Sequence, residues 1–327
     1  MHPFAQYIRT LGRGKKGSRD LTQEEAYDAF KMILNNEVEA EQLGAFLMLV
    51  RVKEETPAEL AGFVQAAREA IPTVEPSINI DLDWSSYAGK RRQLPWFLLS
   101  ALLLAHNNTK ILMHGLRGRK DNRVYTPDIL SLFDLSSADS LTTAIADIQQ
   151  YNFAFIELDH LVPKLAELIE LREILGLRSP VHSLSRLLNP LNAPNVIQGI
   201  FHPGYKAIHR DAAILLNTPQ ATIIKGDGGE IEMNPDVDNE TFTVAQGEHT
   251  AEVWPAMFGG KRHLKDETMN SERLLKVWRG DIEDEYGEAA VVLTAAVALK
   301  LIGKASNQAD ALALAKQCWQ NRPKDKY

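Results

Sequence analysis

The chain has 327 residues, of which 45% are hydrophobic and 24% are charged, and this composition indicates a folded globular protein rather than a disordered one. Its single cysteine, Cys318, excludes an internal disulfide and a cysteine metal cluster and favours a reducing, cytoplasmic location. The formal net charge of −7, taken alone, argues against a nucleic-acid-binding protein.

The N-terminal region predicts a small helical domain. Thr22 with Glu25, and Thr56 with Glu59, have the spacing of capping boxes that begin two helices. A further helix is expected over residues 40–52, between them. The N-terminus lacks the apolar core of a signal peptide. The longest apolar run, 94–105, is about 12 residues, too short for a membrane span. No membrane partner is expected.

From residue 75 onward the pattern becomes α/β. Short β-branched or aromatic runs at 110–114, 153–157, 196–202 and 221–225 alternate with helical patterns, which is typical of βαβ units. The predicted fold class is α/β: a small N-terminal helical domain plus a larger α/β domain around a mostly parallel sheet, with a cleft between them. We expect residues 1–74 and roughly 160–192 in the helical, dimerising domain, and 75–159 and 193–327 in the α/β domain.

Basic charge is concentrated in two segments. Residues 9–19 contain five basic residues and no acidic one, a pattern that fits a solvated arm as well as a binding element. Residues 89–123 contain eight basic residues and one acidic residue. Because the loops at the carboxyl ends of parallel strands share one edge, these cations are expected to meet there. The candidate nucleic-acid-binding residues are Lys90, Arg91, Arg92, Arg117, Arg119, Lys120, Arg123, Arg178, Lys206 and Arg210.

The order of several motifs resembles that of the anthranilate phosphoribosyltransferases and their relatives, the pyrimidine nucleoside phosphorylases. These motifs are LTQEEAYDAF, TPDIL, REILGLR, NPLNAP, GIFHP and GDGGEIE, and together they cover nearly the whole chain. The resemblance implies a helical domain and an α/β domain, an active cleft between them, and a dimer formed through the helical domain. It also implies phosphoribosyl pyrophosphate and magnesium as ligands of active members.

The catalytic motifs of that family are altered in this sequence. The glycine-rich GTGGD loop is replaced by DWSSYAGKRR, in which only Gly89 remains, and backbone approach to a pyrophosphate favours glycine. The KHGNR motif becomes Met113 to Arg117, and the acidic pair of GLDE becomes Ile231 and Glu232, so that one magnesium ligand is missing. Arg172 matches the arginine of REILG.

This pattern resembles the YbiB-type branch, whose members are dimeric nucleic-acid-binding proteins without the transferase reaction. The sequence therefore predicts non-sequence-specific binding of DNA, and possibly RNA, by a cytoplasmic homodimer through basic grooves at the domain junction. No catalytic residue, metal or cofactor is expected. The alternatives are a phosphoribosyltransferase or phosphorylase with an altered substrate, and an inert scaffold for a partner.

Other residues have a structural and a functional interpretation. Tyr87 and Tyr125 are candidates for stacking on bases, whereas Trp96 and Phe97 fit a buried core better. His114, His202 and His209 are more often structural than catalytic. For Asp227, Glu230 and Glu232, an ordinary turn is favoured over the remnant of a metal site.

Overall fold

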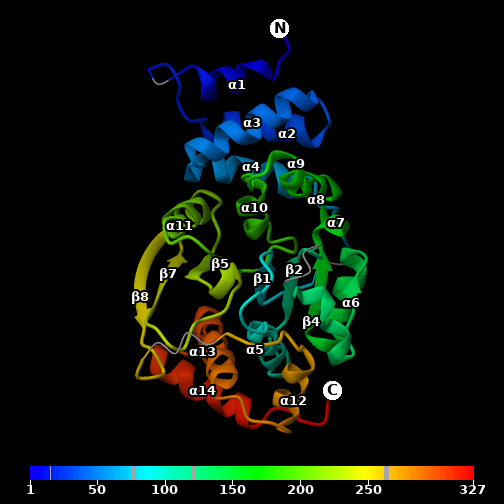
Figure 1. Cartoon of the computed structure of the whole chain (residues 1–327), viewed down its shortest axis with the longest axis vertical. Helices are drawn as coiled ribbons and strands as arrows, with labels where there is room; N and C mark the ends of the chain where they lie inside the picture. The colour runs from blue at the N-terminus through cyan, green and yellow to red at the C-terminus, as the bar shows by residue number, and fades with distance from the viewer. Residues whose placement is uncertain (15, 76–77, 119–122, 261–264) are drawn as a thin grey trace.

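A computed structural model describes residues 1–14, 16–75, 78–118, 123–260 and 265–327 of the chain. Helices at one end of the molecule form a group that lies above the sheet in Figure 1. They are α1 (Ala5–Gly12), α2 (Gln23–Leu34), α3 (Ala40–Lys53), α4 (Pro57–Glu69), α8 (Pro163–Glu170), α9 (Arg172–Leu175) and α10 (Val181–Leu184). Both predicted capping boxes are confirmed, and the Thr22 hydroxyl accepts a hydrogen bond from the Glu25 amide at 3.1 Å.

The sheet has eight strands in the order β3-β4-β2-β1-β5-β6-β7-β8. The strands are β1 (Leu82–Ser86), β2 (Ile111–Gly115), β3 (Ser137–Ala138), β4 (Phe153–Glu157), β5 (Asn195–Ile200), β6 (Gln220–Lys225), β7 (Asn239–Ala245) and β8 (Glu248–Trp254). The first six strands in this order are parallel, and β7 and β8 extend the sheet as an antiparallel hairpin. All four predicted strands are confirmed, although β5 ends at Ile200, two residues earlier than expected.

Helices cover both faces of the sheet, as the layers in Figure 1 show. Alternate residues of β2 point to opposite sides, since Ile111 and Met113 belong to one apolar cluster and Leu112 to another. The first cluster contains α5 (Trp96–His106), α12 (Glu272–Arg279), α13 (Glu285–Leu301) and α14 (Gln308–Gln320). The second cluster joins the sheet to α6 (Leu141–Tyr151) and to the helical group, and α11 (Tyr205–Leu215) covers β5 and β6.

The predicted fold class is confirmed by this arrangement: a helical N-terminal domain precedes a larger α/β domain with a mostly parallel sheet. The precise boundaries at 74, 160 and 192 stay a prediction. The apolar stretch of residues 160–177, which fits the periodicity of a helix, is not one continuous helix, because α7 (Leu158–Leu161), α8 and α9 are separate. Pro163 begins α8, and proline cannot continue the preceding helix. None of the helices in the described ranges could cross a membrane.

Candidate functional site

The candidate site lies at the carboxyl edge of the sheet, beside the central strands β1 and β5. The chain leaves β1 toward β2 on one side, while β5 lies on the other side, so this is the point where the strand order reverses. The loop after β1, residues 87–90, meets the turn after β6, residues 226–230. Gly89 has a φ of +64°, and a Cβ there would lie 2.8 Å from the Tyr125 ring, so glycine is required at this position.

The backbone amides and carbonyls of this loop form hydrogen bonds with side chains of the same chain. The Ala88 and Gly89 amides both donate to Glu230 Oε1 at 2.6 Å. On the other side, Arg123 Nη1 donates to the carbonyls of Ala88 and Gly89, each at 2.8 Å. Glu230 is fully buried. An internal carboxylate therefore occupies the pair of amides that an anionic ligand would otherwise use.

Lys90 corrects one prediction from the sequence. Its side chain is 1% exposed and forms ion pairs with Asp227 and with Glu232, the latter at 2.5 Å. Burial alone would lower the pKa of Lys90, but the adjacent carboxylates outweigh burial and raise it. Lys90 is consequently a buried structural cation and cannot contact a phosphate at the surface.

The same ion pairs also determine whether Asp227 and Glu232, in and after the turn that follows β6, are available to bind the magnesium that the resemblance implies. Asp227 and Glu232 both bind the ammonium of Lys90, and Glu232 Oε2 also accepts from the Phe97 amide at 2.9 Å. Both oxygens of Glu232 and one oxygen of Asp227 are therefore engaged by donors of the protein, and a lysine ammonium lies between the two carboxylates where a divalent metal would have to bind. Within the described ranges, no cluster of three metal-ligating side chains was found. The residues form a turn, as the sequence indicated, and its acidic side chains stabilise the preceding loop.

Tyr87 is also placed differently from the prediction. It is 5% exposed, and its hydroxyl lies 2.7 Å from His114 Nδ1, while His114 Nε2 lies 3.3 Å from Asp83 Oδ2. This buried chain of polar groups leaves no ring face of Tyr87 for a base. His114 and His209 are both buried, and burial lowers the pKa of His209 to about 3, so that it is neutral and structural.

Five arginines gather over the same edge of the sheet, and we call them the arginine cluster. They are Arg91, Arg123, Arg172, Arg178 and Arg186. Arg91 and Arg123 come from the α/β region, whereas the other three come from the segment of α9 and α10 that crosses above the sheet. Arg186 lies in a short 3-10 helix, Ser185–Leu187, and donates to the Gly229 carbonyl at 3.1 Å.

The arginines are close enough to perturb one another. Burial lowers the pKa of Arg178 to about 10, and Arg186, Arg172 and Arg123 contribute to this shift. Burial likewise lowers the pKa of Arg123, with smaller effects in the same direction from Arg91 and Arg172. Like charges that repel each other in this way are stabilised when an anion binds between them.

Few carboxylates offset this charge. Among the residues that the structure describes, none of the five arginines has an ion pair with an aspartate or glutamate. Glu230 is the nearest acid that influences Arg123 and Arg186, and its second oxygen, Oε2, is buried without a hydrogen-bond partner. Its first oxygen is held by the loop amides. The arginine cluster therefore keeps a net positive charge.

The other predicted site residues lie in different surroundings. Arg91 and Arg92 are exposed, and Arg123 and Arg178 belong to the arginine cluster, so these four lie at the carboxyl edge as expected. Arg117 lies beside the edge, but it forms an ion pair with Glu157 at 2.9 Å. Arg119 and Lys120 lie outside the described residues.

Lys206 and Arg210, on α11, are not part of the arginine cluster. Lys206 is 7% exposed and pairs with Glu240, while Arg210 pairs with its neighbour Asp211 at 2.6 Å. Both cations lie over the ring of Phe242. Neighbouring acids and the Phe242 ring hold both side chains, so their part in binding stays a prediction.

Sequence reasoning missed Arg186 and gave Arg172 a role only through the resemblance. Arg186 is 7% exposed, a burial unusual for an arginine, and no local pattern indicates it. The one available signal was the segment RSPVHSLSR, which brings two arginines into a stretch already expected to cross the domain junction.

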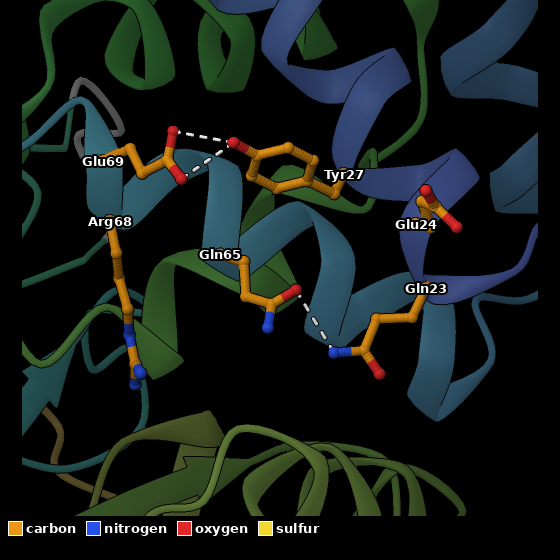
Figure 2. A pocket seen from close by; sticks show the side chains of 6 residues that line it. All are labelled: Gln23, Glu24, Tyr27, Gln65, Arg68 and Glu69. Atoms are coloured by element: carbon orange, nitrogen blue, oxygen red, sulfur yellow. Dashed lines mark hydrogen bonds between the residues drawn. The ribbon is translucent and has the colours of Figure 1, made fainter.

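A separate hollow lies on the helical domain, between α2 and α4, as Figure 2 shows. It has a volume of about 590 Å³ and is open to solvent. The Tyr27 hydroxyl bonds to Glu69 at 2.8 Å, and Gln23 bonds to Gln65 at 3.2 Å across it. Arg68 extends away from the hollow to donate to the carbonyls of Leu187 and Leu188, so it ties α4 to the crossing segment. None of the arginine cluster lines this hollow.

Comparison with known proteins places this site in a recognised fold. Residues 5–71 match the glycosyl transferase family, helical bundle domain. Over the whole chain, the anthranilate phosphoribosyltransferase of Thermus thermophilus superimposes with a TM-score of 0.82 and 21% identity, covering 98% of this chain and 94% of that one. The chain has an anthranilate phosphoribosyltransferase-like fold.

Two kinds of relative share this sequence pattern. The uncharacterized protein YbiB of Escherichia coli K12 is 27% identical over 71% of this chain and 73% of its own, and an uncharacterized protein of Aquifex aeolicus is 29% identical over 77% of each. The anthranilate phosphoribosyltransferase of Paracidovorax citrulli is 28% identical over 91% of this chain and 88% of its own. The chain is therefore similar both to YbiB and to enzymes of this fold.

Proposed function

We propose that this protein binds DNA, and also RNA, without sequence preference, through the arginine cluster and the adjacent Arg92. The observation that carries the proposal is a group of arginines at the edge of the sheet that, among the described residues, have no ion pair with an acid and lie beside the buried carboxylate of Glu230. Arginines from two regions of the chain are well suited to contact successive phosphates of one backbone. Such contacts position a strand but do not read bases.

The interior of the site supports binding without transferase chemistry. The loop amides are held by Glu230, and the two carboxylates of the turn are held by Lys90. The chain therefore supplies its own anion and its own cation where the active fold would place a pyrophosphate and a metal. Calorimetry with phosphoribosyl pyrophosphate and magnesium is expected to give no binding heat. Micromolar binding would favour the alternative, a transferase or phosphorylase with an altered substrate.

The proposal includes a cytoplasmic homodimer formed through the helical domain. Three large apolar side chains of that domain are exposed: Val52 by 77%, Ile174 by 82% and Leu177 by 51%. A second copy of the chain would cover such residues and would double the number of arginine clusters. Sedimentation analysis should give a dimer, and replacing Ile174 and Leu177 by glutamate should give monomers.

A salt titration with a labelled single-stranded oligonucleotide tests the binding function. The logarithm of the association constant should fall linearly with the logarithm of the salt concentration, by roughly 0.7 for each phosphate contact. The combined variant Arg91→Ala, Arg92→Ala and Arg172→Ala should lower this slope by about 2 and weaken binding to all sequences alike.

The control is a variant that removes equally exposed cations elsewhere. Lys276 on α12 and Lys316 on α14 are exposed and lie at the opposite end of the molecule from the helical domain (Figure 1). Lys276→Ala with Lys316→Ala should leave the slope unchanged. A flat salt response of the unmodified protein, or the same slope in the triple variant, would overturn the proposal.

A further inference from the structure

Phe201 is an exposed aromatic residue at the carboxyl edge of the sheet. It directly follows β5, its exposed fraction is 47%, and the next three residues are exposed as well. All five tryptophans of the chain, in contrast, are at most 3% exposed. A single exposed apolar residue is ordinary on a protein surface, so its neighbours decide whether it has a role.

Those neighbours belong to the candidate site. A Cβ built on Gly229 would lie 3.3 Å from the Cβ of Phe201 and 3.4 Å from that of Ala88. Gly229, in the turn after β6, thus lies between Phe201 and Ala88, which belongs to the loop after β1. Arg186 donates to the Gly229 carbonyl, and Arg123 donates to the Ala88 carbonyl. Phe201 therefore adjoins the residue to which Arg186 donates, and it lies across Gly229 from a residue to which Arg123 donates.

The base of the Phe201 side chain is held while its ring is half exposed. The ring packs edge-to-face against His202, with centroids 4.8 Å apart and planes at 88°. This contact pairs the edge of one ring with the face of the other, and His202 is itself exposed. An aromatic ring that is fixed at its base, open to solvent and adjacent to cations has the arrangement by which proteins bind unpaired bases.

We infer that Phe201 stacks on an unpaired base of a strand whose phosphates lie on the arginine cluster, so that the site favours single-stranded nucleic acid over duplex. This inference rests on the proposed function and adds a substrate class to it. In a duplex both faces of each internal base already stack on neighbouring bases. The Phe201 ring would therefore find no free base face to stack on. Phosphate contacts alone do not distinguish the two forms in this way.

The test compares strands that share phosphates but differ in bases. A thymidine oligonucleotide, an abasic strand of the same length and a matched duplex are titrated at one salt concentration. The unmodified protein should bind the thymidine strand more tightly than the abasic strand. Phe201→Ala should weaken binding of the thymidine strand by about 5- to 100-fold, which is the range for losing one base stack, and should leave the abasic strand unaffected.

Phe201→Trp provides an independent readout. Because the native tryptophans are buried, a tryptophan at 201 would be the most exposed one, and its fluorescence should be quenched by the thymidine strand but not by the abasic strand. Leu215→Ala is the matched control, since Leu215 is 40% exposed on α11 and should not change binding. Equal affinity of the unmodified protein for the thymidine and abasic strands would overturn the inference.

The two proposals fail in different ways. If Phe201 has no role, Phe201→Ala binds every strand as the unmodified protein does, while the steep salt dependence remains. If the arginine cluster does not bind nucleic acid, none of the strands binds in a salt-dependent manner. The variants at position 201 then have no binding affinity to alter. Thermal unfolding of each variant confirms that it is folded before it is titrated.

Discussion

Lys90 and Arg91 are adjacent in the sequence, yet they lie in opposite electrostatic environments. The Lys90 side chain is 1% exposed and lies between two carboxylates. Arg91 is exposed, and it lies near enough to Arg123 to lower the pKa of that residue. The first cation is neutralised inside the protein, whereas the second adds to a positive field at the surface.

A run of basic residues in a sequence therefore does not necessarily form a basic surface. Burying a charge is costly unless a partner accompanies it, so Lys90 is accompanied by Asp227 and Glu232. An exposed arginine such as Arg91 bears no such cost and can remain unpaired until an anion binds. The contrast between Lys90 and Arg91 can be tested by the following substitutions, in order of decreasing effect.

Lys90→Met should have the largest effect, and the effect should be on stability. It leaves two carboxylates near each other without their cation, and breaking a buried ion pair in this way costs about 3–5 kcal/mol. The free energy of unfolding measured in urea should fall by that amount. Arg91→Met, next to it, should leave stability nearly unchanged and should reduce the salt dependence of binding. If the two variants behaved alike, the contrast between these residues would be wrong.

His182 should make the region of the arginine cluster sensitive to acid. Burial, followed by the neighbouring Arg178, lowers the pKa of His182 to about 3, against about 6.5 in an unfolded chain. Below about pH 6.5 the His182 imidazole binds a proton in the unfolded chain, whereas in the folded chain it stays neutral down to about pH 3. The folded state should therefore lose stability as the pH falls from about 6.5 to 3, by about 2 kcal/mol at pH 5.

His182→Gln removes this titration and should reduce the dependence of the unfolding free energy on pH over that window, to which His209 still contributes. Urea unfolding at pH 7 and at pH 5 measures the change. His182 Nδ1 lies 3.2 Å from the Ser179 carbonyl, and glutamine has a side-chain donor that can replace this contact. An unchanged difference between the two pH values in the variant would show that His182 is protonated in the folded protein.

Lys206→Ala should have the smallest effect. Lys206 is paired with Glu240 and lies against Phe242, away from the arginine cluster, so its removal should change nucleic-acid affinity by less than about twofold. The stability change should stay within about 1 kcal/mol, because Glu240 is half exposed and can be solvated. If Lys206→Ala lowered the salt dependence of the association constant as much as Arg91→Met does, Lys206 would have to be part of the binding site.

Local features of the fold could be predicted from the sequence. Thr22 and Thr56 begin helices because each capping box is complete within four residues. Strands β2, β4, β5 and β6 were recognisable because both faces of a parallel sheet are buried, which gives short continuous apolar runs. The hairpin of β7 and β8 escaped prediction because it is mostly exposed and polar.

Features that depend on distant residues could not be predicted. Lys90 is buried by Asp227 and Glu232, more than 130 positions away in the chain, and nothing near Lys90 indicates them. The same holds for Arg186, which reaches the site only because α10 crosses the sheet edge. Phe201 was expected inside a strand, but β5 ends at Ile200, directly before it.

The two edges of the sheet bear on how the protein resists aggregation. An unpaired edge strand can recruit another chain, and proteins counter this with short or charged edges. At one edge β3 has only two residues. At the other, β8 carries Glu248 and Glu252, and Gln308 donates to the Val253 carbonyl at 3.0 Å, so that one backbone acceptor is already used. Both edges are thus poor templates for a further strand, which keeps sheet-to-sheet association from competing with the native assembly.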